Sequence, residues 1–116
     1  MEELDRAAET LRQVDAKFRL AWILTRAAQA DLGRGDAARA RVRAAEALDL
    51  ALAVRRPSEV TFARSLLVRA AEALGDLAAA RQQRAALRRE PVQAGSAAAR
   101  RALESISPGK ETRACR

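Results

Sequence analysis

Apolar residues recur at three- and four-residue steps along most of this chain, which is the spacing of one face of an α-helix. Charged and polar residues occupy most of the positions between them. Five segments carry the pattern, at residues 3–13, 17–33, 37–54, 58–74 and 77–89. The pattern predicts an all-α protein.

The dipeptide Gly-Asp stands at two of the expected helix boundaries, at Gly35-Asp36 and at Gly75-Asp76. Glycine tolerates the left-handed backbone conformation in which many helices end. An aspartate in the next position accepts hydrogen bonds from the free N–H groups that open the following helix. We therefore expect the two glycines to occupy equivalent left-handed turn positions between antiparallel helices.

A proline marks the boundary between the second and third of these longer helices. Pro57 disfavours helical geometry in the residue before it, so Arg55-Arg56-Pro57 is expected to end the helix that begins at residue 37. Ser58 is expected to cap the helix that follows.

The chain repeats itself with a period of forty residues. The spacing indicates a helix-turn-helix unit that occurs twice, and residues 3–13 then look like the closing helix of a preceding unit. The aligned pairs are Trp22 with Phe62, Leu20 with Val60, Gly35 with Gly75, Asp36 with Asp76, Ala38 with Ala78, Ala40 with Ala80, Arg41 with Arg81 and Ala45 with Ala85.

The two units resemble tetratricopeptide repeats, in particular the long Ala-, Leu- and Arg-rich versions in bacterial multidomain regulators. In the first unit the family pattern is matched by Leu24, Ala28, Ala40 and Ala47, while Asp31, Ala44 and Leu52 depart from it. The resemblance implies antiparallel helix pairs stacked as a short right-handed α-solenoid over residues 1–90. The expected divisions are a half repeat at 1–15 and repeats at 16–56 and 57–90.

In the resembled family the first helix of each pair lines a concave surface that binds a protein or peptide partner. The resemblance therefore implies a groove formed by Trp22, Thr25, Gln29, Phe62, Ser65 and Arg69. An aromatic at the same place in both units would support an apolar side chain of the partner, and Arg69 would pair with a carboxylate. The alternative is that Trp22 and Phe62 are wedges in a core that contains few other bulky groups, since 30 of the 116 residues are alanine.

The net charge of +7 includes 20 arginines and raises a second possibility, a small basic helical protein associated with DNA or RNA. Residues 1–90 carry 17 basic and 13 acidic groups, so charge is mixed in the repeat region. We interpret the arginines of the second helices as a solvated face and do not expect nucleic-acid binding. These arginines are Arg39, Arg41, Arg43, Arg81, Arg84, Arg88 and Arg89.

The residue types that most enzymes use are scarce. Histidine is absent, and the single cysteine, Cys115, can neither close an intrachain disulfide nor complete a metal site. We expect no enzymatic activity, no cofactor and no metal. No segment has the length and apolarity of a membrane span, and the acidic N-terminus lacks the form of a signal peptide, so we expect a cytoplasmic protein.

The composition changes after residue 89. Residues 91–106 are expected to form a short capping helix, and residues 107–116 a disordered tail. The expected array starts in the middle of a repeat, and we expect that whichever end lacks a capping helix could pair with a second copy or with another chain. A fragment of a longer array is a further alternative.

Overall fold

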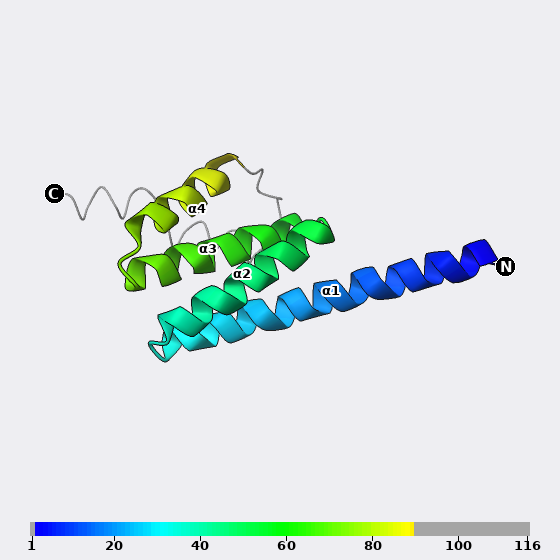
Figure 1. Cartoon of the computed structure of the whole chain (residues 1–116), viewed down its shortest axis with the longest axis horizontal. Coiled ribbons are helices and arrows are strands. Elements are labelled where there is room, and N and C mark those ends of the chain that lie inside the picture. The colour runs from blue at the N-terminus through cyan, green and yellow to red at the C-terminus, as the bar shows by residue number, and fades with distance from the viewer. Residues whose placement is uncertain (1, 90–116) are drawn as a thin grey trace.

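The computed structural model describes residues 2–89, and every element in this range is a helix (Figure 1). The elements are α1 (Glu2–Gly33), α2 (Ala37–Ala53), α3 (Pro57–Ala73) and α4 (Leu77–Arg89). The predicted all-α fold is therefore confirmed for this part of the chain. The capping helix expected at 91–106 and the tail expected at 107–116 lie outside the described residues.

Each helix packs against the next one along the chain, and α1 also contacts α3. Figure 1 shows the chain reversing direction at each of the short turns. The first helices of the two expected units, α1 and α3, are therefore neighbours as well as sequence equivalents. This contact between α1 and α3 forms the candidate site described below.

The core is built mainly from alanine. Because a methyl side chain fills little space, the helix backbones can approach closely and still pack without voids. Bulk comes from a few larger residues, which include Val60, Leu66 and Leu67. The fully buried alanines of the main cluster are Ala28, Ala40, Ala44, Ala47, Ala51, Ala63 and Ala70.

All three turns in residues 2–89 have the same backbone design. Gly35, Arg55 and Gly75 adopt positive φ values of 82°, 55° and 78°. In each turn the next residue donates its backbone N–H to a carbonyl five positions earlier, which satisfies a free carbonyl at the helix end. These bonds are Asp36 to Asp31 at 2.8 Å, Arg56 to Ala51 at 3.0 Å and Asp76 to Ala71 at 2.8 Å. The left-handed positions predicted for the two glycines are confirmed.

The N-cap residues predicted from the sequence are confirmed at two of the three turns. Asp36 accepts a hydrogen bond from the backbone N–H of Arg39 at 3.1 Å, and Asp76 accepts one from Ala79 at 3.1 Å. The prediction that Ser58 caps α3 is wrong. The N-cap residue is Arg56, which makes no side-chain cap, and the helix begins at Pro57. Proline suits this place because the first N–H groups of a helix have no partner within it.

The separate helices expected at residues 3–13 and 17–33 form one continuous helix, α1. Val14, Asp15 and Ala16, which join the two segments, include neither glycine nor proline, so nothing interrupts the backbone hydrogen bonds. The closing helix of a preceding unit is thus an extension of the first helix. Figure 1 shows this extension projecting beyond the other three helices.

Candidate functional site

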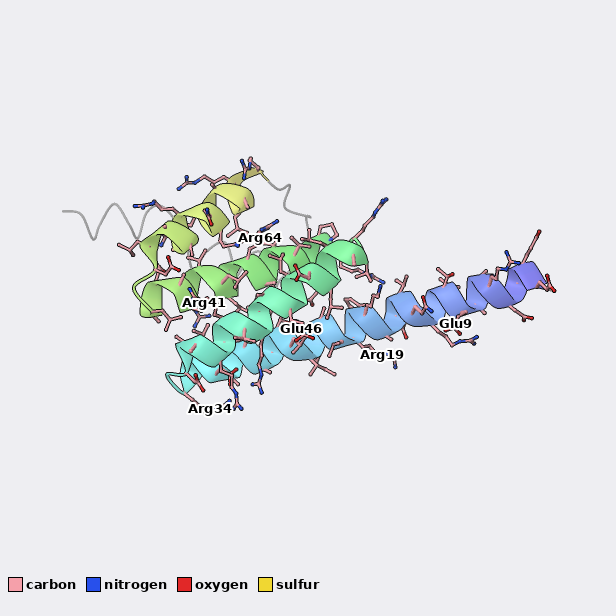
Figure 2. The ribbon with its side chains drawn as sticks, in the orientation of Figure 1. Glu9, Arg19, Arg34, Arg41, Glu46 and Arg64 are labelled. Carbon is pink, nitrogen blue, oxygen red and sulfur yellow. The ribbon has the colours of Figure 1, made fainter. Side chains whose placement is uncertain are left out.

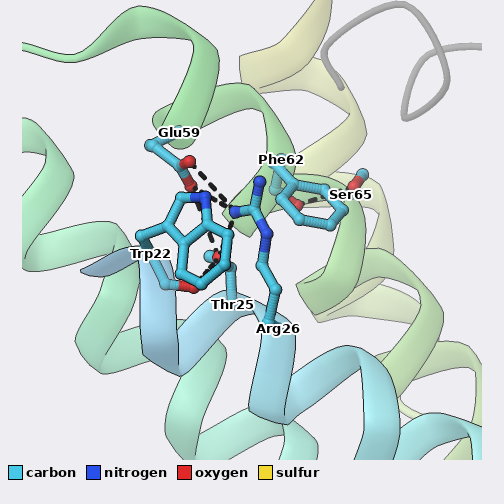
Figure 3. Close-up of polar contacts among 6 residues, drawn as sticks. All are labelled: Trp22, Thr25, Arg26, Glu59, Phe62 and Ser65. Carbon is cyan, nitrogen blue, oxygen red and sulfur yellow. Dashed lines mark hydrogen bonds and ion pairs between the residues drawn. The ribbon is translucent and has the colours of Figure 1, made fainter. Parts of the chain in front are cut away.

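An arginine lies between two aromatic rings where α1 meets α3. The guanidinium carbon of Arg26 is 4.5 Å from the ring centroid of Trp22 and 4.8 Å from that of Phe62. Trp22 and Arg26 come from successive turns of α1, whereas Phe62 comes from α3 (Figure 3). A cation over an aromatic face contributes about 0.5–2 kcal/mol, depending on how far it is desolvated. The stack therefore ties the two helices together.

A buried carboxylate fixes the position of this arginine. Nη1 of Arg26 donates to both carboxylate oxygens of Glu59, at 3.0 and 3.2 Å, and to the Thr25 hydroxyl at 2.8 Å (Figure 3). The Thr25 hydroxyl donates in turn to the backbone carbonyl of Trp22 at 2.8 Å. Glu59 stands in the first turn of α3, where the helix dipole also favours a negative charge. The charge of Arg26 is thus compensated by Glu59, while about one third of its side chain stays exposed.

The six residues predicted to line a groove differ in their exposure to solvent: three are exposed, one is half-buried and two are buried. Trp22 is 47% exposed, and Gln29 and Arg69 are also exposed. Phe62 is half-buried and packs against the main core cluster. Phe62 thus acts in part as a wedge in the core, as the alternative interpretation predicted. Trp22 does not, because much of this side chain faces solvent.

Thr25 and Ser65 do not line an open surface, because both side chains are buried. Each hydroxyl donates to the backbone carbonyl three residues earlier, at 2.8 Å for Thr25 to Trp22 and 2.7 Å for Ser65 to Phe62. Thr25 and Ser65, forty residues apart, therefore make the same hydrogen bond inside their helices. The prediction that Thr25 and Ser65 line an open groove is therefore wrong.

Sequence reasoning missed Arg26 and Glu59, the two charged members of the site. The forty-residue alignment pairs Arg26 with Leu66, which is buried, and so gives no reason to expect a functional arginine. The available signal was the spacing of Arg26 four residues after Trp22, which places both on one helix face.

A second buried carboxylate lies near the first turn. Asp31 is fully buried and accepts hydrogen bonds from Arg34 at 2.6 Å and from Arg43 at 3.0 and 2.8 Å. Arg34 belongs to the α1–α2 turn and Arg43 to α2, so the carboxylate joins the two helices. Asp31 was noted as a departure from the tetratricopeptide pattern, and two arginines now account for its burial.

Two other arginines of the second helices also contact acidic residues. Arg41 of α2, labelled in Figure 2, donates to Asp76 in the α3–α4 turn at 3.0 Å, and Arg84 of α4 pairs with Glu72 of α3. The predicted solvated face is wrong for Arg43 and Arg84, whose side chains are mostly buried, whereas the Arg41 side chain stays 43% exposed. The hydrogen bond from the Ala79 backbone, followed by that from Arg41, lowers the pKa of Asp76 below its ordinary value.

Within residues 2–89, acidic side chains do not gather in threes as a metal site requires, and none of the described helices could span a membrane. No family model, curated protein or solved structure matches the chain. The geometry of the α1–α3 surface is therefore the basis for a functional proposal.

Proposed function

We propose that this chain is a non-enzymatic, tetratricopeptide-like scaffold that binds a peptide segment of a partner protein on the surface where α1 meets α3. The observation that supports the proposal most directly is the Arg26 guanidinium, which is held between Trp22 and Phe62 and remains partly open to solvent. A fixed cation beside a half-exposed indole offers both charge and apolar area to a ligand.

The stacking of the helices as a short right-handed solenoid is part of the same proposal. Its support is that α1 and α3, one period apart in sequence, contact each other directly as well as through α2. The recurring turns at residues 35, 55 and 75 end α1, α2 and α3 with the same backbone hydrogen bond. Equivalent residues of repeated units then face the same way, which places Trp22 beside Phe62.

The chemistry of the surface indicates which peptide it would bind. All hydrogen bonds from Arg26 to described residues use Nη1, and a guanidinium has further N–H groups on its other two nitrogens. These groups suit a carboxylate or a backbone carbonyl of the ligand. Gln29 and Arg69 follow Trp22 and Phe62 by seven residues on their helices, which extends the polar surface in one direction. We infer a ligand with an apolar side chain next to an acidic one.

The cellular setting is also part of this proposal. The Ala- and Arg-rich composition is typical of GC-rich bacterial genomes, and the resembled repeats occur in bacterial regulators. We place the protein in the bacterial cytoplasm, where its partner would belong to a regulatory or assembly system.

The proposal is tested by selecting ligands from a displayed peptide library and measuring their affinity for variants. Trp22→Ala and Arg26→Ala are each expected to weaken a selected peptide about tenfold or more. Phe62→Ala combined with Arg69→Ala is expected to do the same. Leu77→Ala is the control, because Leu77 is an exposed apolar residue on α4, away from this surface. Equal affinity for the Trp22, Arg26 and control variants would refute the assignment.

Nucleic-acid binding is the competing hypothesis, favoured only by the net positive charge. Affinity for DNA or RNA should fall steeply as salt rises, because phosphate contacts release counterions. Binding of a partly apolar peptide should fall much less. A steeply salt-dependent affinity for a generic duplex, with no selected peptide, would replace our proposal with this one.

A further inference from the structure

The first half of α1 carries an apolar stripe that other described residues cover only at its Phe18 end. Leu4 and Leu11 are 67% and 69% exposed, and Phe18 follows at the same seven-residue spacing, which keeps all three on one face. The next residue in this series is Thr25, which is buried beside Glu59 of α3. The stripe is therefore the continuation of the face that α3 covers.

The cover ends where α3 begins. Arg56, the N-cap residue of α3, places its guanidinium carbon 4.5 Å from the Phe18 ring centroid. The N-terminal part of α1 projects beyond the other helices (Figure 1). An open hollow of about 390 Å³ adjoins this point and is lined by Phe18, Arg19, Trp22 and Ile23. A second helix laid along the extension would continue the packing that α3 begins.

The charges of the extension are divided between its two halves. Residues 2–9 contain four acidic groups and one basic group, a net charge of −3, and residues 10–19 contain three basic groups and one acidic group, a net charge of +2. The exposed pairs Arg12–Glu9 and Arg19–Asp15 within the helix contribute little and leave this division in place. Two such helices attract each other when they run antiparallel and repel each other when they run parallel.

We propose that the extension of α1 pairs with the same extension of a second copy, antiparallel, about a two-fold axis near Leu11. In this arrangement Leu4 of each chain lies opposite Phe18 of the other, at the edge of the hollow. Glu3 lies on the same side of the pair as Lys17 of the other chain, and Asp5 lies on the same side as Arg19. The proposal does not depend on peptide binding, and its tests leave Trp22 and Arg26 unchanged.

Sedimentation of the full chain across a range of micromolar concentrations tests the pairing. The protein is expected to form a dimer that Leu11→Glu weakens about tenfold or more, because two buried leucines are lost per dimer. Val42→Glu is the matched control, since Val42 is also 69% exposed but lies on α2. Circular dichroism verifies that both variants keep their helices. A monomeric protein, or a dimer that both substitutions affect equally, would overturn the proposal.

Disulfide cross-linking tests the direction of pairing, in a Cys115→Ser background. Leu11→Cys is expected to form a disulfide-linked dimer on mild oxidation. Leu4→Cys is not, because antiparallel pairing separates the two copies of residue 4 by about 21 Å at a rise of 1.5 Å per residue. Equal cross-linking at both positions would indicate parallel pairing and contradict the proposal.

The reactivity of the Leu11→Cys thiol in a monomer would identify what else occupies the stripe. A thiol that resists a maleimide reagent would show that another segment of the same chain covers it. A thiol that reacts readily would show that the stripe is open in the monomer and available to a different protein. Both outcomes overturn the proposed pairing of two copies.

Discussion

Arg55 stands twenty residues after Gly35 and adopts the same left-handed backbone conformation, with a φ of 55° against 82°. Gly75 follows after another twenty residues, at 78°. All three turns have the same backbone hydrogen bond, so Arg55 occupies the position that glycine occupies in the other two turns. The described chain thus repeats a helix and a turn every twenty residues, and the forty-residue period of the sequence is twice this unit.

Replacing Arg55 with glycine should stabilise the protein. An L-residue in the left-handed region is strained by about 1–2 kcal/mol, and the greater freedom of glycine in the unfolded chain offsets about half of this. We expect Arg55→Gly to raise the free energy of unfolding by about 0.5–1 kcal/mol, measured by urea denaturation. Arg56→Gly is the control, since residue 56 has a negative φ, and it should not stabilise. A loss of stability in Arg55→Gly would show that the arginine side chain contributes more than its strain costs.

Replacing Gly35 or Gly75 with valine should have the opposite effect. An added Cβ would meet no atom within 4 Å at either position, so the cost comes from the backbone conformation alone. Each substitution is expected to lower the free energy of unfolding by more than about 1 kcal/mol. Gly33→Val serves as the control, because residue 33 lies within α1 and has the same open surroundings. If neither substitution lowered the free energy of unfolding, the proposal that Gly35 and Gly75 are equivalent positions of a repeat would be wrong.

The buried carboxylate of Asp31 should make its two arginines unequal in importance. Arg43 bonds both carboxylate oxygens and is about two-thirds buried, whereas Arg34 bonds one oxygen and is largely exposed. Arg43→Ala leaves a buried charge with a single partner, and we expect a loss of about 2–3 kcal/mol in unfolding free energy. Arg34→Ala should cost less.

The control for this comparison is Arg19→Ala, which removes an exposed pair with Asp15. Such a pair is worth about 0–1 kcal/mol. If thermal or urea unfolding gave the same small loss for Arg43→Ala as for Arg19→Ala, the ion pair would be unimportant for packing α1 against α2.

The stability of the α3–α4 turn should depend on pH through Asp76. Its pKa is lowered in the folded state by the Ala79 backbone N–H and by Arg41, so the folded protein binds a proton less readily than the unfolded chain. The resulting stability is fully present above the ordinary pKa of an aspartate and is lost as pH falls through the lowered one. Asp76→Asn keeps a good cap and should show a shallower loss of stability in acid. Identical pH profiles for the two proteins would contradict this assignment.

Local chemistry was enough to predict α2, α3 and α4 and most of the helix ends, although it did not predict that α1 is continuous. Gly35 and Gly75 end helices because only glycine reaches the left-handed region without strain, and Asp36 and Asp76 cap because their side chains reach nearby N–H groups. These effects act within about five residues, so they can be recognised without a fold. The misplaced cap at Ser58 shows the limit of this approach, because a proline at the first helical position needs no side-chain cap.

Only the tertiary structure shows which faces of the helices pack against each other. Trp22, Arg26 and Phe62 form a stack only because α1 and α3 pack side by side, and an alignment of repeats pairs Arg26 with a buried leucine instead. Asp31 is buried only because α2 brings Arg43 to it. The sequence by itself determined where α1, α2 and α3 end, since the helix ends depend on backbone geometry and near neighbours. Burial and charge pairing depend on residues far apart in the chain, and the packing of the helices sets the distances between them.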